Sequence, residues 1–204
     1  MSETPKTYLI SPPEPDPVTF GDQLSGLLDR FEIAAFRLEL ASSAEDQVAR
    51  TADHLREICH ARDVAIVLSD HYRLAAQLGL DGCHLTGGGR KVRAVRAELG
   101  HDAIVGAFCA ASRHDGLAAG EAGADYVAFG PVGASALGDG RVAEPDLFGW
   151  WSDMIEVPVV AEGGLSQAHV AALADVTDFF GVGAEIWRDP EPARALATLL
   201  TPLR

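Results

Sequence analysis

The sequence predicts an α/β fold built from short buried strands that alternate with helices. Short apolar runs alternate with longer stretches whose apolar residues recur at helical spacing, as in residues 20–30. Several of the runs, such as 64–68, are continuously apolar and rich in β-branched residues, which is typical of parallel strands covered on both faces. Eight strand–helix units can be counted, and closure of eight parallel strands removes the sheet edges. We therefore expect a (β/α)8 TIM barrel.

The ends of the apolar runs give the bounds of each element. The strands are expected at 7–10, 33–40, 64–68, 82–85, 104–109, 126–132, 158–161 and 178–182. The helices are expected at 20–30, from a cap at Ser42 or Ser43 to 62, and at 72–78, 92–99, 116–122, 145–154, 167–174 and 191–200. An open doubly wound sheet is the structural alternative, but no Gly-x-Gly-x-x-Gly follows the first strand.

Length and composition describe an ordinary globular chain. Its 204 residues suit a single domain spanning 1–204. The formal net charge of −14 argues against nucleic acid and anionic membranes as partners. Residues 1–6 are polar, no apolar run is long enough to span a bilayer, and the three cysteines show neither a disulfide nor a zinc pattern. We expect a cytoplasmic protein with buried, reduced thiols.

In a barrel of this kind the functional groups lie where strands end and loops begin. Phosphate sites are often formed by the loops after the seventh and eighth strands. Gly163 and Gly164 follow the seventh strand, and Val182 and Gly183 close the eighth. Glycine lets backbone N–H groups approach phosphate oxygens without a side chain in the way, so we expect a phosphate site here. Tight turns without a ligand are the alternative.

Polar residues at the ends of the second, third and fourth strands are the candidates for catalysis. Arg37 lies among apolar neighbours, so either a bound anion or Glu39 must compensate its charge. Asp70 could bind Mg²⁺ through its carboxylate or cap the following helix. His84, within the fourth strand, either faces a ligand or is a hydrogen-bonded core residue.

Four short segments of the chain carry motifs that point to one family. Residues 122–131 (AGADYVAFGP) resemble the sixth-strand signature of thiamine phosphate synthases, whose family includes thiazole tautomerase-like proteins, and residues 79–85 (GLDGCHL) are similar to their fourth strand. Residues 158–165 (PVVAEGGL) are similar to their phosphate-binding segment, and residues 8–12 (YLISP) match their opening strand. The matches keep their order and span almost the whole chain.

The resemblance implies a (β/α)8 barrel that joins hydroxymethylpyrimidine diphosphate to thiazole phosphate, releases pyrophosphate and uses Mg²⁺. It implies catalytic roles for Arg37, Asp70 and His84, with Asp70 as metal ligand. It implies substrate binding by Ser69 and by the glycine loops after the last two strands. The expected partners are small phosphorylated substrates, and a homodimer is one oligomeric state that the chain could form.

The sequence departs from the family pattern mainly at charged positions. The family has Arg-x-Lys after its second strand, where this chain has Arg37 and Glu39. Its Asn-Asp pair corresponds to Ser69 and Asp70, its second metal-binding Asp falls in the glycines of 87–89, and a fifth-strand serine corresponds to Phe108. The loop at 134–137 lacks the family's lysine.

These departures leave two hypotheses. One is a thiamine phosphate synthase-type transferase with a rebuilt pyrophosphate site. The other is a diverged relative without synthase activity, either a thiazole phosphate tautomerase or a non-catalytic protein that binds phosphorylated ligands. Each lost charge-assisted contact to phosphate is worth about 1.5–3 kcal/mol. The two hypotheses therefore differ in whether the chain can still bind the pyrophosphate group of the first substrate.

Overall fold

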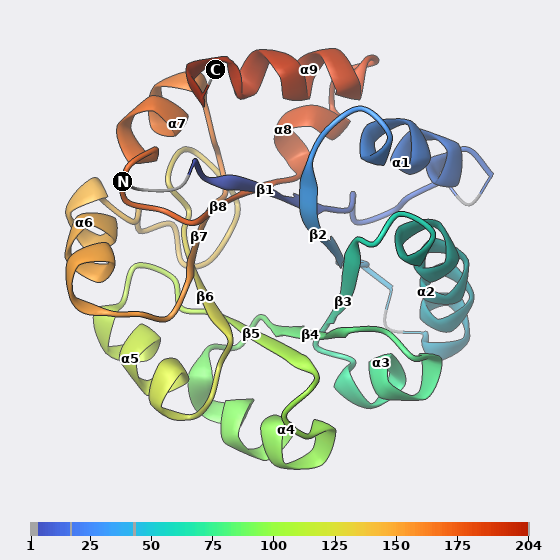
Figure 1. Ribbon diagram of the computed structural model, residues 1–204, viewed down its shortest axis with the longest axis horizontal. Helices are drawn as coiled ribbons and strands as arrows, with labels where there is room; N and C mark the ends of the chain where they lie inside the picture. The colour runs from blue at the N-terminus through green and yellow to red at the C-terminus, as the bar shows by residue number, and fades with distance from the viewer. Residues whose placement is uncertain (1–3, 17, 43, 204) are drawn as a thin grey trace.

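A closed ring of parallel strands forms the centre of the molecule. The computed structural model describes residues 4–16, 18–42 and 44–203. Eight strands pair in sequence order, and β1 also pairs with β8, which closes the barrel (Figure 1). The strands are β1 (Lys6–Ile10), β2 (Ile33–Leu38), β3 (Ala65–Ser69), β4 (Gly82–Leu85), β5 (Ile104–Phe108), β6 (Tyr126–Phe129), β7 (Val159–Glu162) and β8 (Phe179–Val182). The predicted (β/α)8 barrel is confirmed.

Helices surround the ring and follow each strand in turn (Figure 1). They are α1 (Phe20–Leu28), α2 (Glu45–His60), α3 (Tyr72–Leu78), α4 (Val92–Leu99), α5 (Arg113–Glu121), α6 (Pro145–Met154), α7 (Gln167–Leu173), α8 (Ala184–Trp187) and α9 (Pro192–Leu199). Short 3₁₀ turns lie at Gly89–Lys91 and Thr201–Leu203. Three predicted helices, at 72–78, 92–99 and 145–154, match the structure in both bounds.

Some expectations about the helices are wrong, and α5, for example, begins at Arg113 rather than at residue 116. The four-residue helix α8 directly follows β8, and the sequence indicated only one later helix there. The side chain of Ser42 does not cap α2, because the helix begins after Ala44 and the Ser42 hydroxyl donates to Gln47 instead. The other candidate cap, Ser43, lies outside the described residues, as do the first three residues of the polar segment 1–6.

Apolar side chains pack in two layers on either side of the strands. The larger cluster fills the space between barrel and helices and includes Leu9, Phe36, Phe129 and Trp151. A smaller cluster contains Tyr8, Val67, Tyr126 and Val160, which alternate along their strands with residues of the first cluster and therefore face the barrel axis. Arg37, His84 and Glu162 are buried as well. The barrel interior therefore combines aromatic and charged groups.

Glycines bring the loops after β6 and β7 into direct backbone contact. Gly164 has a φ of +74°, and a Cβ there would lie 2.6 Å from the carbonyl carbon of Gly133. A Cβ on Gly133 would in turn lie 2.2 Å from the carbonyl oxygen of Gly164. A side chain at either position would force the loops apart, so both glycines are required by the fold itself.

Among the described residues, no helix is both long enough and apolar enough to cross a membrane. The three cysteines are free and buried, as expected, and burial raises the pKa of each thiol to about 12. Neutral thiols of this kind behave as small apolar side chains.

Candidate functional site

The predicted site residues fall on two opposite parts of the barrel mouth. The first, which we call the β2–β4 wall, consists of Arg37, Glu39, Ser69, Asp70 and His84. The second, the β7–β8 wall, consists of the predicted residues Gly163, Gly164, Val182 and Gly183, together with Glu185, which was not predicted. In a closed ring of eight strands, three strands lie between β3 and β7 in either direction, so the two walls face each other.

Arg37 is enclosed by carboxylates. Its side chain is 3% exposed, and its Nη2 lies 2.9 Å from Glu39 and 2.9 Å from Glu162. The sequence predicted compensation by an anion or by Glu39, and Glu162 from β7 adds a second carboxylate. Two carboxylates share one guanidinium, so this wall presents no excess positive charge to a ligand.

A chain of hydrogen bonds connects Arg37 to two tyrosines inside the barrel. The Arg37 Nη1 lies 2.9 Å from His84 Nε2, His84 Nδ1 lies 2.9 Å from the Tyr126 hydroxyl, and the Tyr126 and Tyr8 hydroxyls are 2.5 Å apart. Because a guanidinium can only donate, His84 Nε2 accepts and Nδ1 carries the proton. The ring stacks on Tyr126 with centroids 5.7 Å apart. His84 is therefore a hydrogen-bonded interior residue.

Burial shifts the titration of this interior cluster. Burial, followed by the charge of Arg37, holds the pKa of His84 well below its ordinary 6.5. Burial also raises the pKa of Glu162, although the Arg37 charge acts in the opposite direction. Within the described part of the chain, Glu162 Oε1 and Arg37 Nε have no hydrogen-bond partner. The cluster therefore holds a neutral imidazole and a carboxylate that is costly to keep ionised.

Ser69 and Asp70, at the end of β3, behave differently from each other. The Ser69 hydroxyl donates to Glu39 at 3.4 Å, a long contact. The carboxylate of Asp70 is exposed and accepts bonds from the Thr86 N–H, at 3.0 Å, and from the Thr86 hydroxyl. The residue preceding α3 is His71, so Asp70 does not cap that helix. Asp70 instead joins the ends of β3 and β4 and leaves a carboxylate facing solvent.

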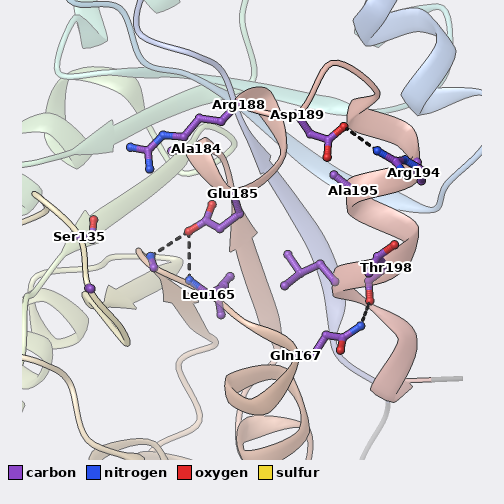
Figure 2. A pocket seen from close by; sticks show the side chains of 13 residues that line it. Ser135, Leu165, Gln167, Ala184, Glu185, Arg188, Asp189, Arg194, Ala195 and Thr198 are labelled. Carbon is purple, nitrogen blue, oxygen red and sulfur yellow. Dashed lines mark hydrogen bonds and ion pairs between the residues drawn. The ribbon is translucent and has the colours of Figure 1, made fainter.

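The β7–β8 wall presents its backbone N–H groups to a carboxylate of the same chain. Glu185 Oε1 accepts from the N–H of Gly164 at 2.8 Å and of Leu165 at 3.1 Å (Figure 2). Its Oε2 accepts from the N–H of Gly183 at 2.8 Å. The N–H donors of both glycine loops thus converge on one point, where the expectation from the sequence was a bound phosphate. Here the anion is a side chain.

The other two predicted residues of this wall act through packing. The carbonyl of Gly163 accepts bonds from the N–H groups of Val132 and Gly133, so this glycine anchors the β6 loop. The side chain of Val182 is fully buried in the layer between barrel and helices. Neither points a side chain toward the pocket, so any contact with a ligand would come from the backbone.

A cavity of about 620 Å³ lies against the β7–β8 wall. Its lining includes Ser135, Gly164, Glu185, Arg188, Asp189 and Arg194. In Figure 2 Arg188 extends toward the Ser135 side of the pocket, while Arg194 points toward Asp189, with which it forms an ion pair. Among the described residues, no group of three or more His, Cys, Asp or Glu side chains is placed to hold a metal ion.

Sequence reasoning missed the roles of Glu162, Glu185, Tyr8 and Tyr126. Strand alternation was a usable signal for three of them, because Tyr8, Tyr126 and Glu162 occupy inward-facing positions as Arg37 and His84 do. Glu185 gave no such signal. An acidic residue in the first turn of a short helix has an ordinary local explanation, and only the fold brings Gly164 to it.

Comparison with known proteins gives a consistent result. The family model described as thiamine monophosphate synthase matches residues 7–183. The chain is 39% identical over 195 residues to a thiamine-phosphate synthase of Rhodospirillum centenum, with 94% of each chain covered. It is 38% identical over 206 residues to a thiamine-phosphate synthase of Erythrobacter litoralis, and the match covers 97% of this chain and 96% of that relative.

Solved structures agree on the architecture. Thiamine phosphate pyrophosphorylase from Pyrococcus furiosus superposes with a TM-score of 0.82 at 20% identity, covering 97% of this chain and 95% of that chain. Orotidine 5'-phosphate decarboxylase from Pyrococcus horikoshii gives 0.69 at 15% identity, with 97% and 99% coverage. At these identities the structural likeness speaks for the fold, and the sequence matches decide the family. The chain belongs to the thiamine monophosphate synthase family.

Proposed function

We propose that this protein is a thiamine phosphate synthase-type transferase, which joins hydroxymethylpyrimidine diphosphate to a thiazole phosphate and releases pyrophosphate. The observation that carries the proposal is the pair of opposite walls on one barrel mouth. An exposed carboxylate lies after β3, and converging N–H donors lie after β7 and β8. Two substrates bound to opposite walls would meet over the barrel axis.

The reaction breaks one bond and forms another. The bond between the pyrimidine methylene carbon and the diphosphate oxygen breaks, and its electron pair leaves with pyrophosphate. The thiazole nitrogen then donates its lone pair to the methylene carbon, which gives the thiazolium product. Holding both partners in line supplies much of the rate enhancement in such a step. The chain's part is to bind, orient and exclude water.

The interior groups fit a supporting role. Arg37 and His84 are almost completely buried, so we propose that they act as positioning residues. They hold Glu39 and the C-terminal end of β2 in place. Glu39, whose side chain is 38% exposed, and Ser69 form the surface that a substrate meets. The neutral state of His84 keeps an extra positive charge out of the interior.

Mg²⁺ is proposed as the cofactor, with Asp70 as its protein ligand. Mg²⁺ is commonly held by one or two carboxylates together with substrate phosphates and water, and a single exposed carboxylate beside a diphosphate fits that description. Bound there, the ion would neutralise charge that develops on the leaving diphosphate. The hydrogen bonds from Thr86 fix the orientation of the Asp70 carboxylate.

The purified protein, both thiamine precursors and Mg²⁺ provide the direct test. Formation of thiamine phosphate with release of pyrophosphate is expected. If no product forms while a thiazole ligand still binds, the diverged binding protein or tautomerase becomes the better description, a reading favoured by the carboxylates around Arg37. We also propose that residues 1–204 act as one barrel domain in the cytoplasm, since three buried free thiols suit a reducing compartment.

Asp70→Asn tests the metal assignment within this assay. It keeps a similar shape and removes the charge, so kcat should fall by about 10²-fold or more and respond to Mg²⁺ only at higher concentration. Asp102→Asn, a surface aspartate in the loop before β5, is the matched control. Equal Mg²⁺ dependence of wild type and Asp70→Asn would exclude Asp70 as the ligand.

A further inference from the structure

The segment between β6 and α6 forms a loop with a closed neck beside the barrel mouth. We call residues 133–142 the β6–α6 loop. At its neck the Ala143 N–H donates to the carbonyl oxygen of Pro131 at 2.8 Å. The Gly133 N–H donates to the carbonyl oxygen of Gly163 at 3.0 Å. Compact loops whose ends are tied together in this way are frequently functional.

The tip of this loop makes its hydrogen bonds to itself. Within the part of the chain that the structure describes, the hydrogen bonds of residues 134–142 all stay inside the loop. The Leu137 N–H donates to Ser135, and both the N–H and the guanidinium of Arg141 donate to Asp139. The position of the tip over the barrel therefore depends on apolar contacts.

Leu137 supplies such a contact. It is half-buried and packs against the smaller cluster that faces the barrel axis, and no other described residue of 134–142 belongs to that packing. Its Cδ2 would lie 2.8 Å from a Cβ added to Gly163, so the side chain reaches the loop after β7. A Cβ added to Gly138 would lie 3.6 Å from two ring carbons of Phe108. The tip thus closes on the ends of β5 and β7.

These contacts involve two positions at which the chain departs from the family pattern. The family has a serine where this chain has Phe108, and it has a lysine in the loop at 134–137, where this chain has none. Both departures replace a polar group by an apolar one. The structure brings them together, because Leu137 packs on the cluster that contains Phe108. A polar edge of the barrel mouth has become an apolar contact.

We propose that Leu137 is a specificity-determining residue, which closes the β6–α6 loop over the barrel mouth and keeps water away from the pyrimidine methylene carbon. The thiazole nitrogen is then the nucleophile that reaches this carbon. The inference rests on the proposed function, because it concerns the nucleophile of that reaction. It leaves both phosphorylated substrates of the reaction as they are.

Water competes with the thiazole for the same carbon. When the bond from the methylene carbon to the diphosphate oxygen breaks, a water oxygen can bond to that carbon in place of the thiazole nitrogen. The products are then the pyrimidine alcohol, pyrophosphate and a proton released to solvent. Closure of a loop that carries an apolar side chain expels water from the site, and this protects a reactive intermediate from hydrolysis. A tip without hydrogen bonds to the barrel can still open to admit substrates.

The ratio of products tests this role. Wild type and Leu137→Ser are supplied with both phosphorylated precursors and Mg²⁺, and thiamine phosphate is measured against pyrophosphate. Nearly every pyrophosphate released by wild type should be matched by a thiamine phosphate. In Leu137→Ser the hydrolysed share of the pyrimidine diphosphate should rise by about fivefold or more, because the loop loses its apolar contact. A residue that only stabilised the fold would lower both products together and leave their ratio unchanged.

Two matched variants separate this contact from other changes in the loop. Ala136→Ser introduces the same side chain at the neighbouring, exposed position, so its product ratio should equal that of wild type. Leu137→Met keeps an apolar side chain of similar volume and should retain the wild-type ratio. Thermal melts of each variant establish that the barrel is intact.

Limited proteolysis measures closure of the loop without turnover. Arg141 is an exposed residue of the β6–α6 loop, and trypsin cleaves after arginine. Cleavage within a loop follows the population of its open form when closing is fast. Leu137→Ser should therefore be cut after Arg141 about threefold or more faster than wild type and Ala136→Ser.

An unchanged product ratio in folded Leu137→Ser would overturn the inference and leave the transferase in place. An equal rise of hydrolysis in Ala136→Ser would overturn it as well, because any change in the loop would then have the same effect. If no protein forms thiamine phosphate, the transferase assignment fails. Faster cleavage of Leu137→Ser after Arg141 would then still identify Leu137 as the closing contact, and equal cleavage of wild type and Leu137→Ser would exclude it.

Discussion

The two walls of the barrel mouth use carboxylates in different surroundings. On the β2–β4 wall, Glu39 and Glu162 compensate Arg37, whose side chain is only 3% exposed. On the β7–β8 wall, Glu185 is half-buried and accepts from three backbone N–H groups beside an open cavity. The first arrangement is a buried ion-pair cluster and the second is a cap over backbone donors.

The two walls differ in how easily their carboxylate contacts can be broken. Removing one partner of a buried ion pair leaves an uncompensated charge in a low-dielectric interior, so that cluster is held together. The Glu185 side chain can rotate into solvent, and the N–H donors that it leaves can bind another anion. We therefore expect the β2–β4 wall to stay in place and the Glu185 contacts on the β7–β8 wall to be broken more easily.

The largest expected effect comes from breaking the fixed wall. Arg37→Met leaves Glu162 without its cation and should lower the free energy of unfolding by about 3–5 kcal/mol at neutral pH. Denaturant unfolding measures it. Because burial already raises the pKa of Glu162, part of the loss should be recovered as the pH falls and the carboxyl group becomes neutral.

The double variant Arg37→Met/Glu162→Leu is the matched control for that measurement. Replacing both buried charges by apolar groups of similar size is often neutral or stabilising. We expect the double variant to be more stable than Arg37→Met alone. A double variant that is no more stable than the single one would mean that Arg37 matters through its packing and its bond to His84 and not through charge compensation.

A smaller effect is expected on the opposite wall. Gly164→Ala places a Cβ at a φ of +74° and 2.6 Å from a backbone carbon of Gly133, so stability should fall by about 2–3 kcal/mol. Gly140→Ala has a φ of +84° with no atom within 4 Å of the added Cβ, so it carries the backbone strain alone. Equal losses in the two variants would show that the close contact with Gly133 is unimportant.

The smallest effect is a pH dependence that originates in His84. Its pKa in the folded protein lies well below 6.5, so the unfolded chain binds a proton first as the pH falls. The stability contributed by the neutral imidazole is complete above about pH 6.5 and is lost below it, by up to about 1.4 kcal/mol per pH unit. Unfolding at about pH 8 and about pH 5.5 should show this loss in wild type.

His84→Gln, which cannot titrate, is the comparison for that loss. Glu162 is present in both proteins, and its raised pKa acts with the opposite sign, so its contribution largely cancels in the difference. The stability difference between wild type and His84→Gln should shrink as the pH falls from about 8 to about 5.5. A difference that does not change with pH would mean that His84 is not held neutral by its surroundings.

Local patterns in the sequence were sufficient for the barrel. Predicted elements such as 72–78 and 145–154 match α3 and α6, since apolar periodicity and turn residues are local properties. Helix α8 was missed because four residues carry too little periodicity to be recognised. The pairing of Arg37 with Glu39 was accessible because the two residues lie two positions apart at the end of β2.

The rest of the site required contacts between distant parts of the chain. Glu162 reaches Arg37 across the barrel axis, and Tyr8 meets Tyr126 although 118 residues separate them. The N–H groups of Gly164 and Gly183 were expected to converge, but the presence of the Glu185 carboxylate at their meeting point was not. Such contacts depend on the register between strands, which no local pattern contains.

The sequence by itself determined the (β/α)8 barrel, the family and the position of two glycine loops, because each depends on short motifs and their order. Only the tertiary structure decided what those parts face. It placed Glu39 and Glu162 on the guanidinium of Arg37, and it placed Glu185 on the N–H groups of Gly164 and Gly183. The reason is that charge compensation depends on distance in space, and the closed ring brings together residues that lie far apart along the chain.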